Sequence, residues 1–345
     1  MPEETIPVRD PVDPDALGRF LSRSGWPAHF ELRQFPAGHS NLTYLLSNES
    51  GEFVLRRPPP GPIAPKAHDM VREARILAAV HPGFPLAPEP LLVCEDASVL
   101  GAPFFLMERR RGRALLQAGE PKDEAVRPRI AAALVAALAD LHRLDVTSPE
   151  IRSLGRPEGF LERQVQGWAS RWDRAQTRDV PAMREVRERL IATMPSSAGA
   201  AVLHNDFKPD NVLLSHEDLS RPTAVLDWEM SALGDPLIDL GILLCYWPEP
   251  ADPPGRRESV CPVTAAPGWP SRAAIALEYG RLTGLDVSDT AYYEAFALFK
   301  LAVILQQIFH RHSMGLTSDP RFAGLEQKVL NLADCAIECT RRATP

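Results

Sequence analysis

Two short segments of the chain carry the residue types that transfer of a phosphoryl group requires. They are HNDFKPDN at 204–211 and LDWE at 226–229. Phosphoryl transfer needs little covalent help, so an enzyme has to orient the attacking hydroxyl, hold Mg²⁺ and neutralise charge. An Asp followed five residues later by an Asn, and then by an Asp at the end of a strand, supplies these groups. We therefore take Asp206 as the candidate base, and Asn211 and Asp227 as candidate magnesium ligands.

Two neighbouring residues allow more than one interpretation. His204 is interpreted as a buried hydrogen-bonding support of the loop rather than a proton carrier. Glu229 follows Asp227 by two residues, so on an extended strand both side chains point to the same side. Glu229 is either support for a second metal ion or a solvated or capping carboxylate. An H-x-D with a later Asn also arises by chance, and only the second segment makes the first one informative.

The elements that must position these residues form two lobes. Residues 1–111 are predicted to be a small α+β lobe that binds a nucleotide, and they include an acidic, proline-rich leader at 1–27. Its expected strands are FELRQFP, NLTYLLSN and EFVLRRP, with a turn at 49–51, and later PEPLLVCED and PFFLMERR. Between them, HDMVREARILAAV has apolar residues three and four apart, which predicts a helix that ends at 81–83.

The remaining residues, 112–345, are predicted to form a larger and mainly helical lobe. Apolar stripes predict helices at 129–143, 291–312 and 324–342, and RQVQGWASRWDR is read as a further helix. Apolar β-like runs at 201–214 and 222–228 carry the candidate catalytic residues. The segment 247–270 holds seven prolines, and it is predicted to be a loop or lid rather than an element.

Composition limits the classes of protein that the chain can be. Its 38 Lys and Arg against 45 Asp and Glu give a net charge of −7, which argues against a nucleic-acid binder. No signal peptide or membrane span is visible, so we expect a cytoplasmic protein. The 5 cysteines have no paired spacing, which suggests neither a disulfide framework nor a zinc site. The oligomeric state cannot be read from the sequence.

The chain resembles the aminoglycoside phosphotransferase and choline kinase family, which has a bilobal protein-kinase-like fold. Within that family it is most similar to the branch that also occurs joined to acyl-CoA dehydrogenases. Relatives mostly carry Gly where this chain has Asn205. The motifs that carry the resemblance cover nearly the whole chain: GHSNLTYLL (38–46), FVLRRPPPG (53–61), HDMVREARIL (68–77), FFLMERRRG (104–112), LADLHRLD (138–145), GFLERQVQGW (159–168), HNDFKPDNVLL (204–214), VLDWEMSALGDPLIDLG (225–241) and AFALFKLAVILQQI (295–308).

The resemblance implies specific roles in the small lobe. Arg56 occupies the position of a residue that contacts phosphate, with Glu73 on the following helix as its ion-pair partner. The alternative for Arg56 is a surface charge on a strand. The resemblance further implies that Gly38, Ser40 and Asn41 lie in a loop that covers the nucleotide. Leu106, Met107 and Glu108 would form the hinge whose backbone hydrogen-bonds adenine.

In the larger lobe the resemblance implies that Asp206 orients or deprotonates the acceptor hydroxyl, while Asn211 and Asp227 bind Mg²⁺. Asp235 and Asp239 are interpreted as residues that brace the catalytic loop and cap a helix. Trp168, Arg171 and Trp172 share one helix face near the acceptor side of the cleft in family members. They would receive a carboxylate or phosphate beside an acyl chain. Alternatively, both indoles belong to the core and the arginines extend to solvent.

These observations together predict an ATP- and Mg²⁺-dependent phosphotransferase that acts on a hydroxyl of a small molecule. Residues 151–190 hold nine Arg against six Asp and Glu, which favours a hydroxyacyl or hydroxy-acid acceptor over a polycation. An aminoglycoside or other amino-alcohol kinase is the alternative within this class. A catalytically inactive nucleotide-binding pseudokinase is the alternative of another class. A protein kinase is disfavoured because no D-F-G or A-P-E motif follows Asp227.

Overall fold

We describe the fold from a computed structural model, which describes residues 5–36, 41–59, 68–115, 121–317 and 319–342. Two compact units divide the chain. The first unit comprises Met1–Ala114 and Asp210–Ser231, and the second comprises Leu115–Pro209 and Ala232–Pro345. The functional boundary between the lobes at residues 111 and 112 stays a prediction.

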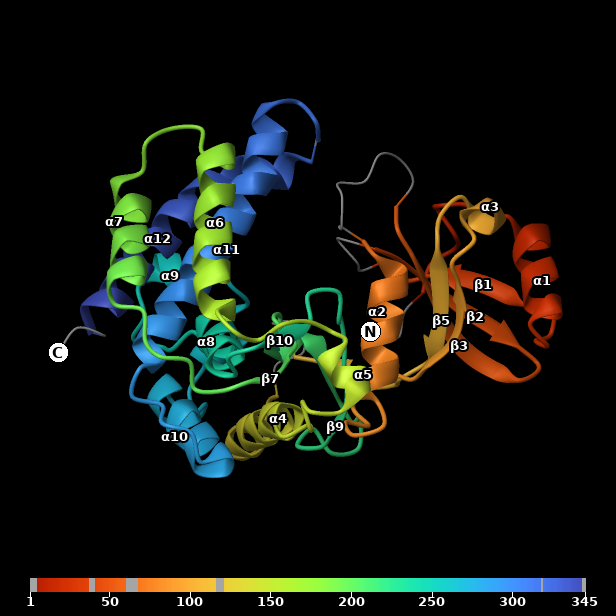
Figure 1. The fold of residues 1–345 in the computed structure, drawn as a ribbon, viewed down its shortest axis with the longest axis horizontal. Coiled ribbons are helices and arrows are strands. Elements are labelled where there is room, and N and C mark those ends of the chain that lie inside the picture. Colours follow the sequence, from red (N-terminus) through yellow and green to blue (C-terminus); the bar gives the residue numbers. More distant parts are fainter. Residues whose placement is uncertain (1–4, 37–40, 60–67, 116–120, 318, 343–345) are drawn as a thin grey trace. The chain divides into compact units, whose positions relative to one another are not determined.

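The first unit is built on a five-stranded antiparallel sheet in the order β1-β2-β3-β5-β4. All five strands were expected from the sequence, and their existence is confirmed. Figure 1 shows helices on both sides of this sheet, with α2 on one side and α1 on the other. The elements are α1 (Pro14–Arg23), β1 (Glu31–Gln34), β2 (Leu42–Asn48), β3 (Gly51–Arg57), α2 (Met70–Val80), β4 (Pro90–Cys94), α3 (Ala97–Leu100) and β5 (Phe104–Glu108).

The alternation of side chains along these strands separates an apolar core from the face that bears the candidate site. Tyr44, Leu55 and Leu106 are fully buried in a cluster with residues of α1 and α3. Because neighbouring residues of a strand point to opposite faces, Arg56 and Met107 lie on the other face of the sheet. Helix α2 packs near β4 and β5. The strand period thus places the buried Arg56 on the face opposite the main apolar cluster.

The candidate metal ligands flank a second, three-stranded sheet of the first unit. This sheet has the order β6-β8-β9, with β6 at Arg113–Ala114, β8 at Val212–Leu214 and β9 at Pro222–Val225. Asn211 stands just before β8 and Asp227 just after β9. The segment leading into β6 passes close to its neighbours at Gly112, which has φ 154°. A Cβ there would lie 2.8 Å from the Leu214 carbonyl oxygen, so only glycine fits without a shift of the backbone.

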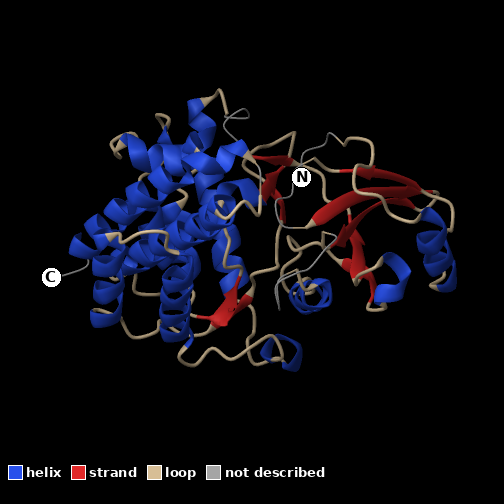
Figure 2. Ribbon diagram, turned by 90° about the horizontal axis from the view of Figure 1, so that it is seen from above, coloured by secondary structure: helices blue, strands red, loops and turns tan. Residues whose placement is uncertain are grey.

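The second unit is mainly helical, as the colouring of Figure 2 shows. The helices predicted at 129–143, 291–312 and 324–342 are confirmed, with ends shifted by one or two residues. Its elements are 3₁₀ turns at Glu124–Val126, Pro262–Ala265 and Pro320–Gly324, the two-stranded sheet of β7 (Ala201–Leu203) and β10 (Ala232–Gly234), and α4 (Arg127–His142), α5 (Pro149–Arg152), α6 (Phe160–Ala175), α7 (Pro181–Ala192), α8 (Leu237–Cys245), α9 (Pro254–Ser259), α10 (Arg272–Thr283), α11 (Thr290–Ser313) and α12 (Leu325–Arg342). A further 3₁₀ turn, Pro209–Asn211, crosses from the second unit into the first.

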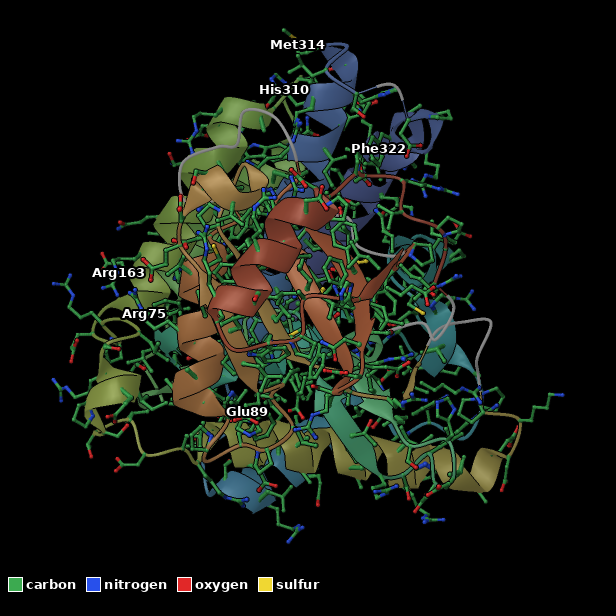
Figure 3. The ribbon with its side chains drawn as sticks, turned by 90° about the vertical axis from the view of Figure 1, so that its right-hand side faces the viewer. Arg75, Glu89, Arg163, His310, Met314 and Phe322 are labelled. Carbon is green, nitrogen blue, oxygen red and sulfur yellow. The ribbon has the colours of Figure 1, made fainter. Side chains whose placement is uncertain are left out.

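Helix α11 is the central helix of the second unit, and it contacts α6, α7, α8 and α12. Every residue from Tyr292 to Val303 is buried. The helix becomes accessible towards its C-terminal end, where Figure 3 labels His310 and Met314. There the His312 ring meets the ring of Phe322 edge-on at 6.4 Å between centroids. Within the residues that the model describes, no helix is long and apolar enough to cross a membrane.

The prediction of a loop over the proline-rich segment 247–270 was wrong in part. The segment contains α9 and the 3₁₀ turn at Pro262–Ala265. Pro254 and Pro262 are the first residues of these elements. Proline is tolerated in a first helical turn because the backbone N–H that it lacks has no partner within the helix there. Proline content alone therefore does not exclude helical structure in this segment.

The close approach of α8 and α11 leads to a prediction about stability. A Cβ on Gly241 of α8 would lie 2.4 Å from the backbone oxygen of Tyr293 on α11. Gly241→Ala therefore forces the two helices apart, and we expect a loss of about 3 kcal/mol in the free energy of unfolding, measured by urea denaturation. Gly324→Ala is the matched control, because a Cβ at Gly324 meets nothing within 4 Å. Equal denaturation midpoints for the two variants would contradict this account of the packing.

Candidate active site

A buried arginine on β3 connects two carboxylates of the first unit. The guanidinium of Arg56 forms an ion pair with Glu73 of α2, with 2.7 Å between Nη1 and Oε1. Its Nη2 lies 3.2 Å from Oδ1 of Asp227, and the whole residue is only 8% exposed. The ion pair with Glu73 that the resemblance implied is therefore present, and Arg56 is not a surface charge. The contact between Arg56 and phosphate stays a prediction.

Burial and the neighbouring charges act on this ion pair in opposite directions. Burial alone would lower the pKa of Arg56, but the carboxylates of Glu73 and Asp227 raise it above its ordinary value. Burial raises the pKa of Glu73 to about 7, and the Arg56 charge opposes that rise. Arg56 thus stays cationic next to Asp227, as a residue that binds phosphate must.

The candidate magnesium ligands Asn211 and Asp227 are brought close by the pairing of β8 with β9. Val212 is opposite Val225 in this ladder, and the N–H of Leu226 donates to the carbonyl of Asn211 at 2.8 Å. Asp227 follows directly, at φ 71°. Its side chain is 37% exposed, so its carboxylate is accessible to an incoming cation. The left-handed backbone is uncommon for a residue other than glycine, although Asp tolerates it better than most.

The Glu229 carboxylate is not simply solvated, because it accepts a hydrogen bond from another side chain. Its Oε2 accepts a hydrogen bond from Nδ2 of Asn41 at 2.8 Å, and Oδ1 of Asn41 lies 2.8 Å from Nδ1 of His68. Because the Asn41 oxygen accepts here, His68 carries its proton on Nδ1. Burial and then the charge of Arg56 lower the pKa of His68, which favours the neutral ring.

Arg72 is a residue of this region that the sequence analysis missed. From α2 it donates to the backbone oxygens of Glu229 at 2.9 Å and of Ser231 at 2.5 Å. It therefore fixes the chain just after Asp227. The predicted helix at 68–80 contained Arg72, but helix periodicity says nothing about a partner more than 150 residues away. Of the predicted nucleotide-covering residues, Gly38 and Ser40 lie outside the described residues.

A pocket of the first unit lies beside the predicted hinge. Met107 and Glu108 line it together with Phe35, Val54, Leu226 and the stretch 109–112. Its walls combine apolar side chains with the three arginines at 109–111. The backbone N–H of Glu108 already donates to the carbonyl of Glu89 at 2.9 Å. Hydrogen bonding of adenine by the hinge stays a prediction.

The oxygen donors of Asn211 and Asp227 in the first unit suit a magnesium ion that is bound together with a nucleotide. Among the residues described, no group of three or more His, Cys, Asp or Glu is placed to hold a metal ion. A protein cage of that kind is not needed, because Mg²⁺ is usually held by one or two carboxylates and by the phosphates of the substrate. The accessible Asp227 carboxylate and the adjacent Asn211 amide are hard oxygen donors of the required kind.

The candidate base lies on the loop after β7, in the second unit. The Asp206 side chain is 21% exposed, and its Oδ2 accepts a hydrogen bond from Nζ of Lys208 at 2.9 Å. The Lys208 ammonium also lies 5.1 Å from the centroid of the Tyr246 ring. Phe207, between the two charged residues, is fully buried and anchors the loop. Lys208 was not among the predicted site residues, although it stands only two residues after Asp206.

The backbone before Asp206 is held by a buried carboxylate. Asp239 of α8 accepts the N–H of His204 at 2.6 Å and the N–H of Asn205 at 2.7 Å. Burial alone would raise the pKa of Asp239, but hydrogen bonds from His142 and His204 outweigh it and lower the pKa. Nδ1 of His204 accepts the N–H of Asp206 at 3.3 Å, which agrees with a supporting role for this histidine.

Asn205 has φ 61°, a left-handed conformation that glycine adopts freely and Asn tolerates. This backbone suits Asn, and it would equally suit the Gly that the family resemblance led us to expect at this position. Asp235 stands just before Pro236, the N-cap residue of α8, and its carboxylate accepts the N–H of Leu237, the first residue of that helix, at 3.0 Å and the hydroxyl of Tyr293 at 2.8 Å. The interpretation of Asp235 and Asp239 as a cap and a brace is confirmed. His142 is a further missed residue, with Nε2 at 3.3 Å from Asp239.

The predicted acceptor residues lie on α6, and the structure places both indoles in the interior. Trp168 and Trp172 are each 5% exposed. The guanidinium of Arg171 stacks on the Trp168 ring at 4.5 Å from its centroid, and Nζ of Lys300 lies 5.6 Å from the same ring. Their role towards an acceptor stays a prediction.

Comparisons with known proteins identify the family of the chain. Residues 31–274 match the model of the phosphotransferase enzyme family. Acyl-CoA dehydrogenase family member 11 from Gallus gallus is 34% identical over 345 residues, which cover 96% of this chain and 44% of that protein. The chain thus spans less than half the length of the curated relatives it matches.

Two solved structures extend the comparison. A putative aminoglycoside phosphotransferase from Ralstonia eutropha has a TM-score of 0.83 and 27% identity, covering 97% of this chain and 100% of that one. A thermostable mutant aminoglycoside phosphotransferase, solved with ADP and hygromycin B, has a TM-score of 0.60 and 14% identity, covering 95% and 99%. The second likeness concerns the fold alone. With a family model that matches most of its length and relatives more than 30% identical, the chain belongs to the phosphotransferase enzyme family.

Proposed function

We propose that the protein transfers the terminal phosphoryl group of ATP, with Mg²⁺, to a hydroxyl of a small molecule. The observation that carries this proposal is the buried Arg56, which bridges Glu73 and the accessible carboxylate of Asp227. A cation held in this way next to a candidate metal ligand suits a triphosphate and its metal ion. The retained base and metal-ligand candidates also argue against an inactive pseudokinase.

The residues of the chain divide the work of the proposed reaction. In the first unit, Asn211 and Asp227 would hold Mg²⁺, which neutralises charge on the phosphates. Arg56 would bind a phosphate oxygen and keep its ion pair with Glu73. In the second unit, Asp206 would accept the proton of the acceptor hydroxyl. Lys208 holds the Asp206 carboxylate before the acceptor arrives.

We further propose an acceptor with an anionic group and an apolar part, such as a hydroxy acid or a hydroxyacyl thioester. Among the described residues, no ion pair or hydrogen bond reaches the Arg171 guanidinium, which stacks on the Trp168 ring. Burial and then the nearby Arg174 lower the pKa of Arg171, because a positive charge is disfavoured there without a counter-ion. A carboxylate or phosphate would supply that counter-ion. The acyl-CoA dehydrogenase names of the relatives agree with an acyl compound.

The test of the proposed acceptor is ATP consumption by the purified protein with hydroxy acids, hydroxyacyl thioesters and aminoglycosides as candidates. We expect turnover with the anionic compounds. Turnover restricted to kanamycin-like compounds would contradict the acceptor class and leave the phosphotransferase assignment standing. If none of the hydroxyl compounds leads to ATP consumption, the proposed function itself is contradicted.

The acceptor proposal also predicts the effect of one substitution. Arg171→Met removes a charged hydrogen-bond donor, so the KM for an anionic acceptor should rise by about 10- to 100-fold, with the KM for ATP unchanged. Arg174→Met on the same helix is the matched control, because among the residues that the structure describes its side chain bonds the Ser170 hydroxyl, at 2.7 Å, on the exposed surface. Equal KM values for the acceptor in the two variants would remove Arg171 from the acceptor site.

A further inference from the structure

Helix α11 carries a positive charge in the middle of its apolar, buried stretch. Lys300 stands in the run AFALFKLAVIL and is only 6% exposed. Removing an ammonium group from water is costly unless it gains hydrogen bonds in return. Burial lowers the pKa of Lys300, and the carboxylates of Asp206 and Asp239 partly offset this effect. A buried lysine in a helix core therefore indicates a specific partner.

That partner is the backbone of the catalytic loop. Nζ of Lys300 donates a hydrogen bond to the carbonyl oxygen of Asn205 at 2.7 Å. The Trp168 ring also lies near this ammonium group, with its centroid 5.6 Å from Nζ, and it stabilises the cation without accepting a directional hydrogen bond. Lys300 therefore connects the central helix of the second unit directly to the residue that precedes Asp206.

The bonded carbonyl belongs to the peptide unit that determines where the Asp206 side chain points. The oxygen of this unit accepts from Lys300, and its N–H, which is that of Asp206, donates to His204. The preceding N–H, on Asn205, donates to Asp239. Asn205 is also held at φ 61°, and such a conformation persists only where the surroundings enforce it.

We propose that Lys300 is a positioning residue that holds Asp206 in its reactive orientation by fixing the Asn205 carbonyl. This inference rests on the proposed function, because it gives Asp206 the role of the base. Lys300 acts through the backbone and does not bind the nucleotide, whose candidate ligands belong to the first unit. Without Lys300, the peptide between Asn205 and Asp206 loses the hydrogen bond from Nζ to its carbonyl oxygen, and its orientation is held less firmly.

The variant Lys300→Met tests this proposal, because methionine has a similar length but neither charge nor donor. We expect kcat with the acceptor to fall by about 10- to 100-fold, since a displacement near 1 Å of a catalytic group has effects of this size. The KM for ATP should stay unchanged. Lys300→Arg, which can still donate to the Asn205 carbonyl, should recover part of kcat.

Gln306→Met is the matched control on the same helix. Gln306 is also buried, and its Nε2 donates to the backbone oxygen of Ala175 at 3.0 Å, away from the catalytic loop. Both variants lose one buried hydrogen bond to a backbone carbonyl, so both should lose stability. A similar kcat for the two variants would show that Lys300 has only a structural role and would overturn the proposal.

Amide hydrogen exchange separates this inference from the proposed function, because it needs no acceptor. We expect the amides of residues 204–207 to exchange faster in Lys300→Met than in the native protein, and to be unchanged in Gln306→Met. Unchanged exchange at 204–207 in the Lys300 variant would overturn the positioning role whatever the enzyme's activity. If Lys300→Met does not fold, Lys300→Gln, which shortens the donor, is measured in the same way. Faster exchange without any phosphotransfer by the native protein would contradict the proposed function alone.

Discussion

We expect Asp206→Asn to lower the turnover number by about 10²- to 10⁴-fold, the contribution of a positioned base. Asparagine keeps the shape of the side chain but cannot accept a proton at neutral pH. The affinity of this variant for ATP, to be measured by calorimetry, should equal that of the native protein, because the groups assigned to the nucleotide lie in the first unit. Near-normal affinity with very low turnover is therefore the expected signature.

The control for this substitution is Asp140→Asn. Asp140 is an exposed residue of α4 whose carboxylate pairs with Arg143 at 2.6 Å, so its loss removes the same charge from the second unit. Its turnover should equal that of the native protein. Turnover of the Asp206 variant within a few-fold of the native value would mean that Asp206 is not the base.

The second large effect is expected from Asp227→Asn. Changes to residues that only support a metal ligand often reduce metal affinity by about 10- to 100-fold, so loss of a direct carboxylate ligand should weaken magnesium-dependent ATP binding by at least about 100-fold. Asparagine is preferable to alanine here, because Asp227 has φ 71° and Asn tolerates that backbone. The variant should therefore stay folded, with Arg56 still paired to Glu73.

Glu229→Gln provides the comparison within the same segment. Its carboxylate accepts from Asn41, and a glutamine oxygen can accept the same hydrogen bond. We expect a smaller loss of ATP affinity than at Asp227. Calorimetry with and without Mg²⁺ measures both variants. If ATP affinity in the Asp227 variant matches the native value under both conditions, Asp227 does not bind the metal.

Much of the local structure follows from the sequence, because it depends on neighbouring residues. The strands of the main sheet and the long helices were predicted from periods of two and of three to four residues. The position of Arg56 on the face opposite the main apolar cluster also follows from strand alternation. The pairing of Arg56 with Glu73 needed the family resemblance, since no local rule connects a strand to the helix that follows it.

The features that the sequence did not reveal depend on contacts between distant parts of the chain. Lys300 bonds a carbonyl 95 residues away, and Arg72 bonds the carbonyl of Ser231 across 159 residues. Nor does the sequence show that 210–231 belongs with the first unit, because this follows from the pairing of β6 with β8. In the apolar pattern of the helix, Lys300 is only an exception. Its hydrogen bond to the Asn205 carbonyl explains why a charged side chain is tolerated in the buried stretch.

The proline-rich segment shows a different limit of sequence interpretation. Proline density predicted a loop over 247–270, yet two of its prolines begin helical turns. Whether a proline ends or begins a helix depends on the conformation of the residues that precede it, which in turn depends on packing. The position of a proline within a helical element, and not the number of prolines in the segment, decides whether the helix can form.

The most direct test of the central claim is detection of the phosphorylated product. Phosphorus NMR of the native protein with ATP, Mg²⁺ and a hydroxy acid or hydroxyacyl thioester should reveal a new phosphate monoester. It should form in equal amount to ADP and be absent with Asp206→Asn. ADP and inorganic phosphate without any phosphate ester, across the whole set of hydroxyl compounds, would contradict the assignment of this protein as a small-molecule phosphotransferase.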